Sequence, residues 1–208
     1  MSMLKMMISF FKDAIKYKRE IKEQSKWIDK YAKIKNYSVN PNPMVSTNLK
    51  IWLTEMSEIY GQRLCPCFDP SGDKDRDREM LCPCKYVDKE IEEYGTCHCA
   101  LFGSKELSKK EWKESASRLM DEYRVKLDIK EDTLDTRGMP MDKFRDLPIP
   151  DASHQLKTAL LTYKKDSIKV IVATEQESLN LKKIAEFKGY KFDSKSDSNH
   201  FEITLKVK

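Results

Sequence analysis

The chain has 208 residues, of which 39% are hydrophobic and 35% are charged, so it is long enough for one large domain or two small ones. Its 39 basic residues exceed its 34 acidic residues by only five, and neither a block of like charge nor a basic stripe interleaved with aromatic residues occurs. This mixed charge disfavours a nucleic-acid partner. The apolar run Met6–Phe11 is far shorter than the ~20 residues of a spanning helix, so we expect no membrane span and a cytoplasmic protein.

Three helices are expected before the first cysteine. Residues 1–24 form an amphipathic pattern, and residues 25–35 show helical spacing again. After the proline-bearing stretch Asn40–Pro43, a third helix is expected to stop at Gly61. Its predicted buried side consists of Leu49, Trp52, Leu53, Met56, Ile59 and Tyr60.

The next part of the chain is predicted to alternate loops with short helices. Asp69–Arg78 is expected to be a solvated loop, and Asp88–Tyr94 one or two helical turns. Helix-favouring sequence resumes over Lys109–Tyr123, with Trp112, Leu119 and Met120 as expected core contacts.

The pattern changes near Arg124. Residues 125–129 alternate as in a strand, 151–164 and 175–188 follow helical spacing, and 168–173 indicate a central strand. Residues 190–192 and 201–207 are expected to pair as a hairpin. This order predicts a small two-layer α/β sandwich. The expected fold class is therefore α+β: an N-terminal amphipathic helix (1–24), a mainly helical domain (25–123) and the sandwich (124–208).

All six cysteines lie between positions 65 and 99, in three Cys-x-Cys motifs: Cys65–Cys67, Cys82–Cys84 and Cys97–Cys99. Clustered cysteines in a reducing compartment are typical of catalytic or metal-binding sites. A cubane iron–sulfur cluster uses four thiolates, which would leave two for a redox-active disulfide. Zinc is the alternative, although six thiols exceed one tetrahedral site and the usual zinc spacing is Cys-x-x-Cys. The residues alone leave both possibilities open.

The motifs Cys-Pro-Cys, Cys-Pro-Cys and Cys-His-Cys, in this order, resemble the catalytic subunit of ferredoxin–thioredoxin reductase. The similarity extends from Trp27 to Phe102 and includes Trp27–Ala32, Leu64 and Cys97–Phe102. It implies that Cys65, Cys82, Cys84 and Cys97 hold a [4Fe–4S] cluster.

The same resemblance implies that Cys67 and Cys99 form a redox-active disulfide, with Cys67 as the exposed nucleophile and Cys99 facing the cluster. His98 would transfer protons, a task suited to an imidazole. The implied electron donor is a ferredoxin, and the implied substrate is thioredoxin or a related dithiol protein.

A second resemblance covers roughly residues 127–208 and points to the TusA/SirA sulfur-carrier family. It rests on Leu134–Gly138, Leu147–Pro150, the strand at 168–173 and Phe187–Tyr190. Leu147 stands where that family has its sulfur-carrying cysteine, and this region contains no cysteine. A docking role and a stabilising role for the domain both stay open.

Two other functions also stay open. The same centre could reduce a persulfide of a sulfur relay or a small disulfide, or the chain could be a zinc-binding interaction module without turnover.

Overall fold

The computed structural model describes residues 3–115, 128–162 and 166–206, and the chain has an α+β fold. It divides into two compact units. The first contains the described residues up to Cys67 and residues 75–115; the second contains Phe68–Lys74 together with the described residues from 128 onward. The boundary expected between residues 123 and 124 lies outside the described residues, as do the last eight residues of the helix expected at 109–123.

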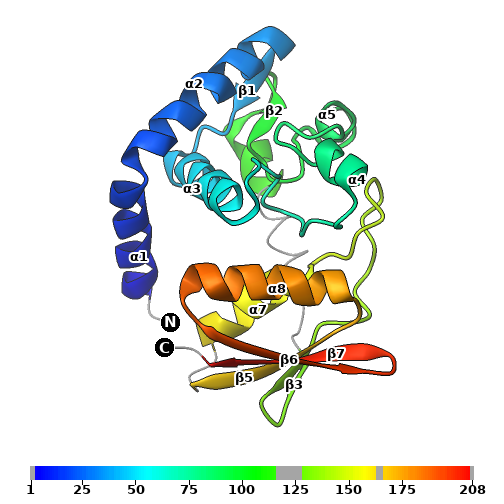
Figure 1. Cartoon of the computed structure of the whole chain (residues 1–208). Coiled ribbons are helices and arrows are strands. Elements are labelled where there is room, and N and C mark those ends of the chain that lie inside the picture. Colours follow the sequence, from blue (N-terminus) through cyan, green and yellow to red (C-terminus); the bar gives the residue numbers. More distant parts are fainter. Residues whose placement is uncertain (1–2, 116–127, 163–165, 207–208) are drawn as a thin grey trace. The chain divides into compact units, whose positions relative to one another are not determined.

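Helices dominate the first unit (Figure 1). They are α1 (Met3–Lys16), α2 (Lys18–Lys35), α3 (Pro43–Tyr60), α4 (Lys74–Glu79, whose first residue belongs to the second unit) and α5 (Val87–Tyr94). Residues 109–115 are also helical. Two short strands, β1 (Tyr37–Val39) and β2 (Phe102–Ser104), pair antiparallel.

The first two helices meet at Tyr17, whereas the expected break lay between residues 24 and 25. Tyr17 is only 3% exposed, and its hydroxyl donates a hydrogen bond to Glu58 Oε2 of α3 at 2.8 Å. The position of the break therefore depends on a tertiary contact with α3, which the hydrophobic periodicity of the sequence does not predict.

Helix α3 begins and ends where its sequence predicts. The side chain of Asn42 accepts a hydrogen bond from the Met44 N–H, and Gly61 ends the helix in the left-handed conformation at φ +70°. The expected burial of Trp52 is wrong, because this residue is 39% exposed while Ile51 is 3% exposed. Helix α3 packs against both α1 and α2, so its buried surface is broader than a single stripe.

The expected solvated loop at 69–78 is only partly correct. Pro70 is buried, whereas residues 72–76 are exposed. The stretch also contains helix α4, whose residues are all charged and include no buried side chain.

The second unit contains a five-stranded sheet in the order β3-β4-β5-β7-β6, with only β4 and β5 parallel. The strands are β3 (Asp128–Lys130), β4 (Thr133–Asp135), β5 (Ser167–Val172), β6 (Lys191–Asp197) and β7 (His200–Lys206). Helices α7 (Ala152–Thr162) and α8 (Glu175–Lys188) cover one face of this sheet in Figure 1. This arrangement matches the two-layer sandwich predicted from the sequence.

Alternation along β5 explains how the second unit forms its core. Ile168, Val170 and Val172 are fully buried, and the residues between them face away. They join a core with these further members: Leu134, Ala152, Leu156, Ala159, Leu181, Ala185, Ile203 and Leu205. Strand β4 and its hairpin with β3 were not expected from the sequence; Glu131 and Asp132 form their tight turn at φ +46° and +70°.

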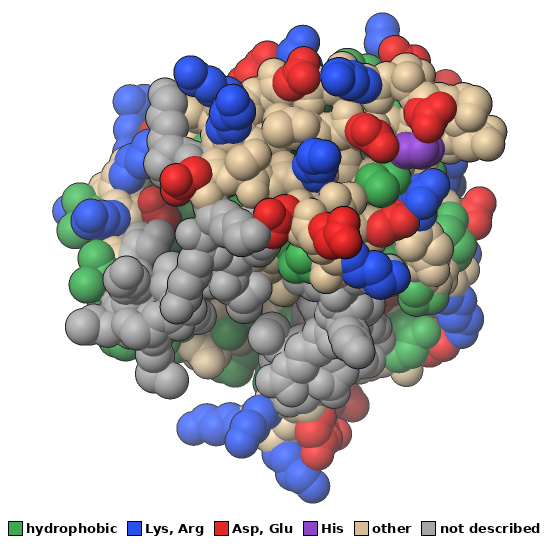
Figure 2. All heavy atoms as spheres, turned by 90° about the horizontal axis from the view of Figure 1, so that it is seen from below, with side chains coloured by type: hydrophobic (Ala, Val, Ile, Leu, Met, Phe, Trp, Pro, Cys, Tyr) green, Lys and Arg blue, Asp and Glu red, His purple; other side chains and the backbone are tan. Residues whose placement is uncertain are grey.

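The surface carries charges of both signs. On the face shown in Figure 2, acidic and basic side chains are interspersed rather than sorted into separate patches. Among the described helices, none has the length and hydrophobicity needed to cross a bilayer.

Candidate cysteine site

Each Cys-x-Cys motif begins directly after a residue in an isolated β-bridge. Leu64 pairs with Leu81, and Thr96 pairs with Gly103. The first cysteine of each motif then donates its N–H to a backbone carbonyl, at 2.7, 2.8 and 2.9 Å for positions 65, 82 and 97. The backbone thus fixes one cysteine of each motif, and these three are among the four expected cluster ligands.

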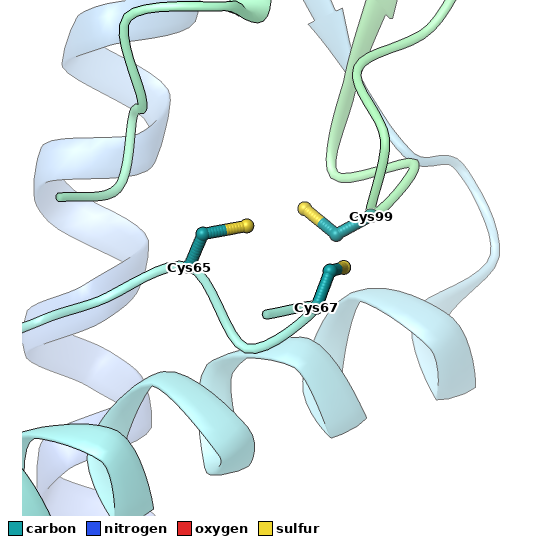
Figure 3. Close-up of side chains that lie close together, drawn as sticks. All are labelled: Cys65, Cys67 and Cys99. Carbon is teal, nitrogen blue, oxygen red and sulfur yellow. The ribbon is translucent and has the colours of Figure 1, made fainter. Parts of the chain in front are cut away.

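Three of the six cysteine sulfur atoms lie close together. The Sγ atoms of Cys65, Cys67 and Cys99 all lie within 4.8 Å of one another. Figure 3 shows the sulfurs of Cys65 and Cys99 directed toward each other, with Cys67 beside them on the same loop as Cys65. The Cys97 and Cys99 sulfurs are 3.8 Å apart. This trio combines one expected cluster ligand with both expected redox cysteines.

The second motif contributes two further buried sulfurs. Burial raises the pKa of Cys82, and Cys65 and Cys97 raise it further through their negative charge when ionised. Arg63 opposes this effect, and its Nε donates to the Cys82 carbonyl at 2.9 Å. Cys84 lies just before α5, where its carbonyl accepts from the Val87 N–H at 3.2 Å.

All six cysteines are buried from solvent, each residue being only 2–7% exposed. The expectation that Cys67 is exposed is therefore wrong, because this residue is 5% exposed. Burial is the main cause that raises the pKa of Cys67. For Cys99, hydrogen bonds with neighbouring cysteines raise the pKa most, followed by burial. An apolar interior thus disfavours the charged forms of Cys67 and Cys99.

His98 is also buried, at 4% exposure. Its backbone N–H donates to Glu90 Oε2 at 2.9 Å, and its Nδ1 lies 3.9 Å from Glu90 Oε1. Glu90 belongs to α5 and is itself 1% exposed. A buried carboxylate thus holds the central residue of the third motif.

Sequence reasoning did not find Glu90 or Arg63 as members of this site. The only signal for Glu90 is its place among the buried residues Val87 and Ile91 of α5, where a charged residue is unusual. Arg63 also stacks on Trp27, with 3.9 Å from its Cζ to the ring centroid, so it links α2 to the second motif.

Six buried cysteines provide only sulfur ligands, and such a site suits a metal that prefers sulfur. Thiolates are the usual ligands of iron–sulfur clusters and of structural zinc, and Cys65, Cys67 and Cys99 are close enough to bind one metal ion. The same proximity places Cys67 and Cys99 where a shift toward the ~2.05 Å of a disulfide would join them. The chemistry available here is metal binding and thiol–disulfide exchange.

Comparison with known proteins agrees with this geometry. Residues 15–125 match the family described as ferredoxin thioredoxin reductase catalytic beta chain. The match includes all three motifs, Glu90 and Arg63, and spans more than half of the chain. No curated protein sequence matches the chain. The chain therefore belongs to the ferredoxin thioredoxin reductase catalytic beta chain family.

Proposed function

We propose that the protein reduces protein disulfides with electrons that a ferredoxin delivers one at a time. The observation that supports this most directly is the convergence of Cys67 and Cys99 with Cys65, all three sulfurs lying within 4.8 Å. Family membership supports the same reaction class. Thioredoxin or a related dithiol protein is the proposed substrate, and a reducing compartment such as the cytoplasm suits six clustered cysteines that form no disulfide with one another.

Four thiolates would hold a [4Fe–4S] cluster, namely those of Cys65, Cys82, Cys84 and Cys97. Burial raises the pKa of Cys82, and a bound cationic metal would compensate this cost because ligand thiols bind metal in the deprotonated state. When bound, the cluster would supply electrons singly to the redox cysteines.

Cys67 would act as the nucleophile. Its thiolate attacks one sulfur of the substrate disulfide, the substrate S–S bond breaks, and the other substrate sulfur leaves as a thiolate. Cys99 then attacks Cys67 Sγ, which releases the second substrate thiolate and forms the Cys67–Cys99 disulfide. Two electrons from the donor and two protons return both cysteines to thiols.

His98 is the proposed proton donor and acceptor for these exchanges. Its neighbour Glu90, 3.9 Å from Nδ1, would stabilise the imidazolium that forms when the ring holds a second proton. A leaving substrate thiolate would take its proton from this imidazolium.

An anaerobic assay with reduced ferredoxin and oxidised thioredoxin tests the proposal. The full chain should be brown, contain about four irons and generate thioredoxin thiols. Cys99→Ser should trap a mixed disulfide between Cys67 and thioredoxin, because the resolving thiol is missing, whereas Cys67→Ser should trap none. A colourless, zinc-containing protein without turnover would contradict the proposal, and trapping through Cys99 in the Cys67→Ser variant would reverse the two roles.

A further inference from the structure

Cys67 is the last residue of its segment in the first compact unit, and Phe68–Lys74, which follow it directly, belong to the second unit. Phe68 is 3% exposed, and Arg145 lies over its ring, with Cζ 4.5 Å from the centroid. A buried aromatic ring covered by a buried guanidinium is held by both dispersion and cation–π attraction. Phe68 directly follows Cys67, the proposed nucleophile, so this contact restrains the backbone next to Cys67.

Asp69 continues this attachment through both its backbone and its side chain. Its N–H donates to Asp151 Oδ2 at 2.9 Å, and its own Oδ2 accepts from the backbone N–H of Ser153 at 3.1 Å. Ser153 lies in the first turn of α7, where N–H groups have no partner within the helix. The two hydrogen bonds therefore join Asp69 reciprocally to the start of that helix.

The carboxyl groups of Asp69 and Asp151 are neighbours in the second unit, and their pKa values shift in opposite directions. Burial, and then the Asp151 carboxylate, raise the pKa of Asp69. Burial also opposes ionisation of Asp151, but His154, whose Nδ1 lies 2.8 Å from Asp151 Oδ1, holds the pKa of Asp151 below its ordinary value. The two neighbouring carboxyl groups thus differ in their tendency to ionise, which reduces repulsion between them.

Pro70 completes the attachment through α8. Its carbonyl accepts a hydrogen bond from Asn180 Nδ2 at 2.8 Å, and Asn180 is 1% exposed. Gln176 donates to Asn180 Oδ1 at 2.9 Å, which fixes the orientation of the amide. Buried amides of this kind are costly to leave unpaired.

We propose that Arg145, Asp151 and Asn180 form a clamp that positions Cys67 through the three residues bonded after it. The clamp holds Phe68, Asp69 and Pro70, and so restrains the backbone on the carboxyl side of the nucleophile. This gives the cysteine-free C-terminal unit a role as a positioning element. The inference rests on the proposed function in its assignment of Cys67 as nucleophile.

Alkylation of Cys67 tests the clamp without requiring turnover. The reduced, cluster-loaded full chain is treated with iodoacetamide, and the modified cysteine is quantified by peptide mapping. Asn180→Ala should raise the rate of Cys67 alkylation about three- to tenfold, the factor that corresponds to loss of about one hydrogen bond. Arg145→Met should act in the same direction. Turnover of thioredoxin should show a lower kcat with a nearly unchanged KM, because the nucleophile loses alignment while the substrate surface is intact.

Thr174→Ala is the matched control. Thr174 caps α8, the helix that carries Asn180, and its side chain accepts a hydrogen bond from the Glu177 N–H at 3.2 Å. Among the described residues, no contact joins Thr174 to Phe68, Asp69 or Pro70. This variant should change Cys67 alkylation and kcat less than about twofold, within the scatter expected for a site that bonds none of the clamped residues. Equal effects of Asn180→Ala and Thr174→Ala, or no effect of Asn180→Ala, would overturn the clamp. Absence of disulfide reduction by the wild-type chain would instead contradict the proposed function, while the alkylation rates would still decide the clamp.

Discussion

The carboxylate of Glu90 accepts a hydrogen bond from the backbone N–H of His98 at 2.9 Å and lies 3.9 Å from the Nδ1 atom of the same residue. Both residues are almost fully buried. This pairing connects α5 to the loop that carries Cys97 and Cys99. Because His98 lies between these two cysteines, the Glu90 side chain restrains the backbone of both the expected ligand Cys97 and the expected redox residue Cys99.

Glu90→Ala should lower the free energy of unfolding by about 1–3 kcal/mol, because it leaves a buried N–H without its acceptor. Glu90→Gln keeps an oxygen that can accept this bond and should cost clearly less. Urea denaturation of both variants measures the difference. Equal losses would show that the charge of Glu90, rather than its hydrogen bond, stabilises the loop.

Iron content should separate the cysteines by role. We expect Cys82→Ser to lose most of its iron and its brown colour, since a hydroxyl replaces a ligand thiolate. Cys67→Ser should retain about four irons per chain while losing disulfide reduction.

Iron and sulfide analysis of anaerobically purified protein makes this comparison. The comparison is needed because the Cys67 sulfur lies close enough to those of Cys65 and Cys99 to bind a metal ion with them. If Cys67→Ser loses iron as completely as Cys82→Ser, Cys67 is a ligand and the proposed division of roles is wrong.

Gly103→Ala should destabilise the first unit by about 1–3 kcal/mol through overpacking. A Cβ at this position would come within 2.7 Å of Trp112 Cη2 and 2.9 Å of Leu107 Cδ1. Gly103 pairs with Ser38 in the short sheet and with Thr96 in a bridge, so the backbone has little freedom to retreat.

The double variant Gly103→Ala/Trp112→Phe provides a control, because phenylalanine lacks the ring atoms nearest to the new methyl group. Thermal denaturation should show that Gly103→Ala costs less in the Trp112→Phe background than in the wild-type background. Equal costs in the two backgrounds would place the strain elsewhere.

The Asp88 carboxylate should make stability depend on acidic pH. It accepts hydrogen bonds from Lys35 Nζ at 2.6 Å and from the Tyr37 hydroxyl at 2.9 Å, and the Lys35 contact is the main cause that lowers its pKa below 3.8. A depressed folded-state pKa stabilises the fold above the unfolded-state pKa, and this contribution is lost as pH falls through the folded-state value.

Asp88→Asn should therefore lower stability by less than about 1 kcal/mol at pH 7, since the pair is largely solvent-exposed. The difference from wild type should shrink as the pH falls below 3.8. Thermal melts of both proteins between neutral and acidic pH measure it. A difference that stays constant across this range would exclude ionisation of Asp88 as its source.

Much of the local structure follows from the sequence. Asn42 and Gly61 mark the ends of α3 because their side-chain chemistry suits helix termini. The alternation along β5 predicts which of its side chains are buried. The number and grouping of the cysteines likewise indicate a metal or redox centre, because thiol chemistry depends on residue type.

The tertiary structure decided what lies next to each cysteine. The Cys-x-Cys spacing predicts neither the burial of Cys67 nor the position of Glu90 beside His98, because both depend on how segments distant along the chain pack together. The same holds for the attachment of Phe68–Pro70 to residues more than 70 positions later. Local patterns determine helix ends and strand faces, whereas contacts between distant segments form only when the whole backbone has folded.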